Sequence, residues 1–198
     1  MLIRGPLTAL ALAIGALLLH SACSSARASR VRWEDLYTFP GILDIEELPP
    51  TEAPETSLAD AIAQVHRRIP DAQLLDARLG RIRGELNCYA RFWEAGAVHV
   101  LDVDLVRDEV WLELSKVSMS RTPSDQQALE SLMHGLADPA AAVATAAESC
   151  AGSWARAVKT RQGTRGPEYA VELVSGSVVR EVCLCARSGE LLPDAPRN

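Results

Sequence analysis

Five cysteines are the residues of this 198-residue chain whose chemistry is easiest to name. Four lie in its main part, and an oxidising compartment would favour disulfides between them, with three complete pairings open. Cys183 and Cys185 are two residues apart on an expected strand, so they point to one face and are poorly placed to bridge each other. The cysteines are Cys23, Cys88, Cys150, Cys183 and Cys185.

The fifth thiol, Cys23, follows a segment typical of an export signal. Arg4 precedes an apolar run from Leu7 to Leu19, which is too short for a permanent membrane helix. Residues 19–23 (Leu-His-Ser-Ala-Cys) resemble a bacterial lipoprotein box, in which Cys23 becomes the lipidated first residue. We therefore expect a signal peptide at 1–23 and a periplasmic or outer-face lipoprotein, anchored to the membrane through Cys23. The alternative is cleavage after residues 26–28 (Ala-Arg-Ala), which would release a secreted soluble protein.

The rest of the composition excludes several classes of function. The formal net charge of −6 becomes −7 when Arg4 is removed with the signal, so nucleic acid is not expected as a partner. No phosphate-binding glycine loop and no nucleophile–base spacing occurs. We predict no catalytic residues, no cofactor and no metal, and hence no enzyme. Thiol or metal handling by Cys183 and Cys185 is kept as a second alternative, although two further zinc ligands are not found at a recognisable spacing.

Hydrophobic periodicity divides the remaining chain. Residues 24–56 form a proline-rich acidic linker. Ser57 is a suitable N-cap for an amphipathic helix that Pro70 ends, and we expect four strands after it. A connecting helix is expected within 118–137, beginning near Ser124. The expected strands are 73–82, 85–93, 97–105 and 110–117.

A second segment with the same plan begins at Asp138, which caps a helix with Pro139 in its first turn. Its helix matches the first at an offset of 81 residues, whereas Tyr89 matches Tyr169 at an offset of 80, which implies a one-residue shift. Self-similarity of this kind predicts paired supersecondary units. The predicted fold class is α+β, with two repeats, 57–117 and 138–194, each a helix packed on a small antiparallel sheet.

The second segment resembles the PepSY domain of exported bacterial proteins and protease propeptides. The resemblance lies in residues 168–174 (Glu-Tyr-Ala-Val-Glu-Leu-Val), Gly176 and residues 188–191 (Ser-Gly-Glu-Leu). It implies a small α+β module, often secreted or membrane-attached, that in some members restrains peptidases and carries no catalytic residues. A weaker architectural analogy connects the chain to the β-lactamase-inhibitory protein class. We therefore expect a non-catalytic protein that binds or restrains a peptidase or another envelope protein, with a structural scaffold lipoprotein as the alternative.

Matching the two segments also gives a hypothesis for the cysteines. Strand alternation places Leu101 and Leu184 on the inner face, so Cys183 and Cys185 would lie on the outer face. Cys150 falls on the inner stripe of a helix and is expected to stay reduced. We hypothesise a disulfide from Cys88 to Cys183 or Cys185, although the face on which Cys88 lies is ambiguous from the sequence.

Overall fold

The computed structural model describes residues 46–82, 84–94, 97–105, 109–111, 117–118 and 123–193, all within one compact unit, Gly41–Asn198. The signal peptide, Cys23 and most of the linker lie outside the described residues. The strand expected at 110–117 is described only in part, as the short strands β5 (Glu109–Trp111) and β6 (Val117–Ser118).

Helix α2 (Leu58–Arg68) forms because its apolar residues repeat at helical spacing and its ends are well capped. The Ser57 hydroxyl accepts a hydrogen bond from the Asp60 amide at 3.1 Å, as predicted from the sequence. The helix ends at Ile69, directly before Pro70, which would break the helix. Its buried residues are Leu58, Ala61, Ile62 and Val65.

Two further helices follow in the second half. The alanine-rich helix α4 (Pro139–Glu148) begins at Asp138, whose carboxylate accepts a hydrogen bond from the Ala140 amide at 2.9 Å. Small residues let α4 lie close against α2 and against the sheet. Helix α3 (Pro123–Met133) precedes it and contacts strand β8.

The three strands predicted at 73–82, 85–93 and 97–105 end within one residue of their predicted bounds, because apolar and polar residues alternate along them. The long strands are β2 (Gln73–Ile82), β3 (Glu85–Glu94), β4 (Ala97–Asp104), β7 (Trp154–Gly163), β8 (Gly166–Ser175) and β9 (Val178–Cys185). The pairing is antiparallel throughout, and the order is β5-β4-β3-β2-β7-β8-β9, with β1 (Glu46–Glu47) beside β2 and β6 beside β4.

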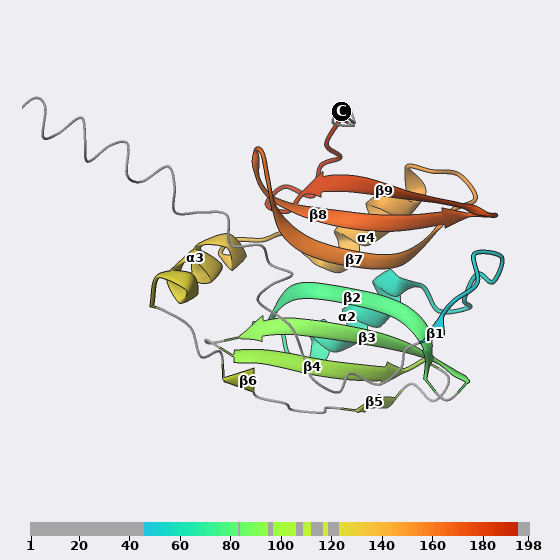
Figure 1. Ribbon diagram of the computed structural model, residues 1–198, viewed down its shortest axis with the longest axis horizontal. Coiled ribbons are helices and arrows are strands. Elements are labelled where there is room, and N and C mark those ends of the chain that lie inside the picture. Colours follow the sequence, from blue (N-terminus) through green and yellow to red (C-terminus); the bar gives the residue numbers. More distant parts are fainter. Residues whose placement is uncertain are drawn as a thin grey trace, which may run out of the picture. The chain divides into compact units, whose positions relative to one another are not determined.

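The predicted fold class, two repeats each with its own small sheet, is wrong. The strands of both segments belong to one continuous sheet, because β2 pairs with β7 over three residues, from Asp76 opposite Lys159 to Arg78 opposite Ala157. This pairing satisfies backbone groups that would otherwise form two exposed sheet edges. Figure 1 shows α2 and α4 behind this sheet, on the same side of the strands.

The predicted one-residue shift between the segments is also wrong. The pairing of β2 with β3 and that of β7 with β8 have the same register at an offset of 81 residues, including a bulge at the same place. Cys88 therefore corresponds to Tyr169, and both side chains are fully buried on the inner face. Tyr89 is only partly buried on the opposite face, so its match to Tyr169 at an offset of 80 does not reflect the structure.

One apolar core lies between the helices and the inner face of the sheet. It runs without a break from Phe92 and Leu101 in the first half to Val171 and Leu184 in the second. Burial of such side chains stabilises the fold by about 1.5–3 kcal/mol each. The inner position predicted for Leu101 and Leu184 is confirmed, since both are 0% exposed.

Candidate functional site

The face of the sheet opposite α2 and α4 carries ion pairs that join six strands. Its residues alternate with core residues such as Ala77 and Val158, so their side chains point away from both helices. We call this set the charged face: Glu47, Asp76, Arg78, Arg91, Arg156, Lys159, Arg161, Glu168, Glu172 and Glu181.

Arg161 links the three strands of the second half. Its guanidinium donates to Glu168 of β8 at 2.6 Å and forms an ion pair with Glu181 of β9 at 2.8 Å. Burial opposes the charged form, but the hydrogen bonds to both carboxylates raise the pKa of Arg161 above its usual value. The buried Ala170 lies between Glu168 and Glu172 on the same face of β8. The carboxylates of Glu168 and Glu181 therefore hold the Arg161 guanidinium in its charged form.

Arg91 and Asp76 form the corresponding link in the first half. The Arg91 Nε donates to Asp76 at 2.8 Å, and a second guanidinium nitrogen completes a two-point contact. Their side chains are only 17% and 25% exposed, so this pair is better shielded from solvent than an ordinary surface pair. Asp76 also lies directly opposite Lys159, across the β2–β7 pairing. The pairing of the two halves thus places opposite charges at facing positions.

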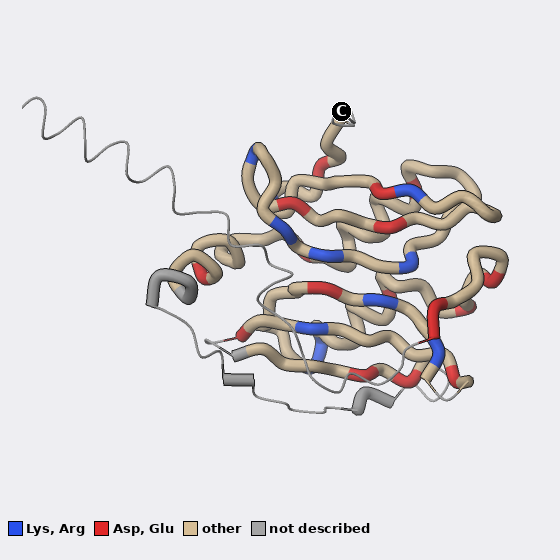
Figure 2. Tube along the Cα trace, in the orientation of Figure 1, with Lys and Arg blue, Asp and Glu red and all other residues tan. Residues whose placement is uncertain are grey.

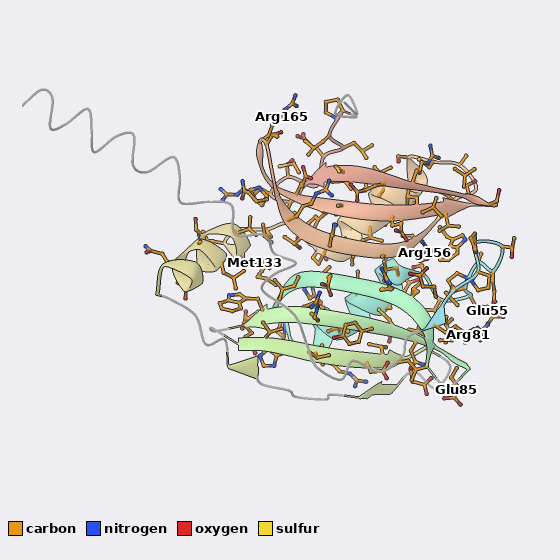
Figure 3. All side chains as sticks on the ribbon, in the orientation of Figure 1. Glu55, Arg81, Glu85, Met133, Arg156 and Arg165 are labelled. Atoms are coloured by element: carbon orange, nitrogen blue, oxygen red, sulfur yellow. The ribbon has the colours of Figure 1, made fainter. Side chains whose placement is uncertain are left out.

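Glu47 of β1 ties the two halves together a second time. Its carboxylate accepts from Arg78 of β2 at 3.1 Å and lies 3.7 Å from Arg156 of β7. Arg156 also contacts Glu172 of β8 at 2.5 Å and is 13% exposed. Figure 3 labels Arg156 between β7 and β2, where β1 approaches them. One carboxylate therefore joins strands that are far apart in the sequence.

The charged face has five cations and five anions, so its local charges nearly cancel. Figure 2 shows both signs interleaved along the strands of both halves. Such a surface produces little long-range attraction for a polyanion, and it suits a partner with a complementary pattern of charges. Sequence reasoning missed this face. Charges two residues apart within β2 and β7 indicated an outward face, but which charges would meet required the strand register.

The structure does not bring together the hypothesised disulfide partners, and all four described cysteines are free. Cys88 points into the core from β3, and three strands, β2, β7 and β8, separate β3 from β9. Neighbouring strands lie about 4.8 Å apart, so Cys88 is roughly 19 Å from Cys183 and Cys185, whereas a disulfide needs Cα atoms within about 7 Å. Burial, followed by the charge of Asp102, raises the pKa of the Cys88 thiol to about 12.

Some of the other sequence predictions concern described residues, and some concern residues outside the described ranges. Cys150 is buried and unbridged, in agreement with its predicted state, and Cys183 and Cys185 are partly exposed on the outer face. Cys23 lies outside the described residues. Within the described ranges, no group of three or more His, Cys, Asp or Glu side chains is placed to hold a metal ion. No helix in that part of the chain has both the length and the apolar character needed to cross a membrane.

Comparison with known proteins gives no family for this chain. No family model and no curated protein matches it. Among solved structures, a protein of Clostridium difficile 630 described as a "putative lipoprotein" is similar, with a TM-score of 0.41 and 14% sequence identity over 75% of this chain and 97% of that chain. A similarity of this size assigns neither a family nor an activity.

Proposed function

We propose that this chain is an exported, lipid-anchored scaffold protein of the bacterial envelope that binds another protein through the charged face and catalyses no reaction. The N-terminal sequence supports export and attachment through Cys23. The charged face supports the binding role, because its side chains are already held by ion pairs. Binding such a surface costs less side-chain entropy than ordering free arginines and lysines would.

The observation that carries this proposal is that three groups of ion pairs lie on one face of the sheet: one joins β3 to β2, one joins β2, β1, β7 and β8, and one joins β7, β8 and β9. Isolated surface ion pairs contribute little to stability, and their usual explanation is a solvated sheet face. Here Arg91, Arg156 and Glu168 are each largely buried within ion pairs on the same face of the sheet. A face whose charges are paired and balanced favours recognition of a protein surface over recognition of nucleic acid.

Charge reversal on the charged face tests this proposal. Lys159 and Arg78 are exposed, so K159E and R78E should leave the fold intact while reversing two charges at the β2–β7 pairing. R165E in the exposed turn between β7 and β8 and R180E on the opposite face of β9 are matched controls. The full chain would be cross-linked in its native envelope, and recovery of bound protein would be quantified by mass spectrometry.

We expect K159E and R78E each to lower recovery of one specific partner at least ten-fold, and the controls to leave it unchanged. Equal recovery with all four variants would overturn the proposed face. The PepSY resemblance suggests an extracellular peptidase as the partner. In that case the full chain would slow at least one thermolysin-type peptidase, and K159E would relieve the inhibition. No inhibition across a broad panel would leave the scaffold role without a peptidase partner.

A further inference from the structure

Strand β9 stands last in the order of the sheet and has β8 on one side only (Figure 1). Among the described residues, three large apolar side chains are exposed, and all three lie at the free edge of β9. Val178 is 61% exposed, Val179 is 42% exposed, and Leu191, which lies beside Leu184 of β9, is 45% exposed. An exposed apolar edge strand is a site at which another chain can pair.

The second half of this edge is already covered by the residues that follow β9. The Cys185 amide donates to the Glu190 carbonyl at 2.8 Å, and the Leu192 amide donates to the Cys183 carbonyl at 2.8 Å. No comparable segment covers the first half within the part of the chain that the structure describes, and residues 178–181 are all exposed. The free part of the edge is therefore the first four residues of β9.

Backbone groups along this free stretch are available for pairing. Successive residues of a strand direct their N–H and C=O groups to alternate sides, and those of Cys183 and Cys185 point to the free edge. The groups of Val179 and Glu181 therefore point to the same edge, because β9 pairs with β8 along its whole length without a bulge. No proline interrupts β9 either, so its charged residues decide which pairing the edge accepts.

We propose that the free half of β9 pairs antiparallel with the same half of a second copy of this chain, with Val179 opposite Val179 of the other copy. A two-fold axis perpendicular to the sheet generates this contact, which is self-complementary. Val178 of each copy then lies opposite Arg180 of the other, and Glu181 lies opposite Ser177. The two Val179 residues exchange two backbone hydrogen bonds, because their N–H and C=O groups point outward.

Charge and steric fit select this register. A pairing centred on Arg180 would place two like charges directly opposite each other, which is destabilising. It would also bring Ser177 of one copy to Cys183 of the other, where Leu192 already occupies the edge. Moving the centre towards the β8–β9 turn shortens the overlap. The register centred on Val179 is therefore the longest one that avoids both conflicts.

The side chains of the free stretch complement those of a second copy. The two Val179 side chains cover each other, and the aliphatic part of Arg180 covers Val178 on the opposite face. Glu181 already forms an ion pair with Arg161 at 2.8 Å, so the contact brings in no unpaired acid. The exposed apolar area at this edge is thus removed from water without a separate partner sequence.

The contact is short, and its strength should be modest. Four exposed residues from each copy bury less surface than the roughly 1,200–2,000 Å² of a standard stable interface, so we expect a dimer that forms with rising concentration. Because the axis is perpendicular to the sheet, the charged faces of the two copies lie on the same side. The dimer itself does not require the charged face to bind any protein.

Disulfide trapping tests the register. The full chain is prepared with serine at Cys23, Cys183 and Cys185, so that only the two buried thiols remain beside an introduced one. Directly opposed residues with mutual hydrogen bonds have Cα atoms about 5.5 Å apart, which is within the range for a disulfide. We therefore expect V179C to form a disulfide-linked dimer under mild oxidation, which non-reducing electrophoresis quantifies.

Two controls accompany V179C in the same background. Residue 178 faces residue 180 of the other copy, so V178C and R180C should each form little dimer alone, whereas an equal mixture of them should form a linked heterodimer. R165C, in the exposed turn between β7 and β8, measures random collision. We expect at least ten-fold more dimer from V179C than from R165C. Equal yields from these two variants, or more dimer from V178C alone than from V179C, would overturn the proposal.

Sedimentation velocity of the full chain in detergent, over a series of concentrations, tests the dimer without cysteine chemistry. V179K places two like charges opposite each other and should weaken association at least ten-fold. L191K is the matched control, because Leu191 is equally exposed at this edge but lies beyond the contact. A native chain that stays monomeric at every concentration would overturn the proposal, and this is the result expected if the edge receives a segment of another protein.

The charge reversal K159E keeps this test separate from that of the charged face. Lys159 lies on β7, with β8 between it and β9, so K159E should leave trapping of V179C unchanged. Loss of partner recovery in K159E with normal trapping would support both proposals. Loss of trapping in K159E would show that the contact between copies is not made by the edge of β9.

Discussion

The Thr160 hydroxyl donates a hydrogen bond to the Leu74 carbonyl oxygen at 2.5 Å, and the two residues are 86 positions apart in the sequence. Thr160 belongs to β7 and Leu74 to β2, so this bond crosses the short pairing that makes the sheet continuous. It lies just beyond the last of the three paired positions, at Asp76 and Lys159. The hydroxyl thus extends the connection where the backbone ladder stops.

Replacement of Thr160 by valine should weaken this connection. T160V keeps the shape and branching of the side chain but leaves the buried Leu74 carbonyl without its hydroxyl partner, which costs about 1–3 kcal/mol in the free energy of unfolding. Urea denaturation measures this cost. T145V is the matched control, because the Thr145 hydroxyl bonds to the Ala141 carbonyl on the exposed side of α4, and we expect it to change stability by less than about 0.5 kcal/mol. Equal effects of T160V and T145V would contradict the role given to Thr160.

Tyr169 fixes the segment between α3 and α4 to the sheet. Its hydroxyl donates to the Ala137 carbonyl at 2.7 Å, and the Ala137 amide donates to the Ala186 carbonyl at 2.7 Å. We expect Y169F to cost about 1–3 kcal/mol in the free energy of unfolding, because the ring still fills the core while the Ala137 carbonyl loses a donor. Thermal unfolding would show this as a lower midpoint. A midpoint equal to that of the native chain would mean that water replaces the tyrosine hydroxyl.

Local features of the chain were predictable from its sequence. The caps at Ser57 and Asp138 fixed where two helices begin, because a side-chain oxygen at that position satisfies a free amide. Alternation placed Leu101, Leu184, Cys183 and Cys185 on their observed faces, since neighbouring residues in a strand point to opposite sides.

Long-range features were not predictable in the same way. Alternation tells which face a residue occupies and says nothing of which strand lies beside it, so the two segments were expected to form separate sheets. Because Tyr89 and Tyr169 are the same residue type, they were matched at an offset of 80 residues. In the structure, the inner position of the first half that corresponds to Tyr169 is occupied by Cys88. The disulfide hypothesis failed for the same reason, because it required the order of the strands.

The two helix caps allow a comparison with matched controls. S57A and D138A each remove an oxygen that accepts a hydrogen bond from a first-turn amide, and we expect each to cost about 1 kcal/mol. S57T and D138N retain an acceptor at the same position and should remain within about 0.5 kcal/mol of the native chain. Circular dichroism during urea denaturation measures all four. A cost for D138N equal to that for D138A would show that the Asp138 charge, which lies 3.8 Å from His66, matters more than the cap.

Cys88 should make the protein less stable in alkali. Its thiol has a pKa raised from 9.0 to about 12 by burial and by Asp102, so the folded chain keeps this proton between pH 9 and 12 while the unfolded chain releases it. The unfolded state therefore binds fewer protons in this range, and the free energy of unfolding falls by roughly 1.4 kcal/mol for each pH unit. The stabilising contribution is complete below pH 9 and is lost as the pH rises.

Urea denaturation under reducing conditions at pH 7.5 and pH 10 should show about 1.4 kcal/mol more loss for the native chain than for C88A, which has no thiol at this position. C185S is the control, because the pKa of Cys185 is lowered. Removing this thiol therefore does not reduce the loss in the free energy of unfolding at alkaline pH. Equal declines in the native chain and in C88A would mean that the Cys88 thiolate gains access to solvent without unfolding of the chain.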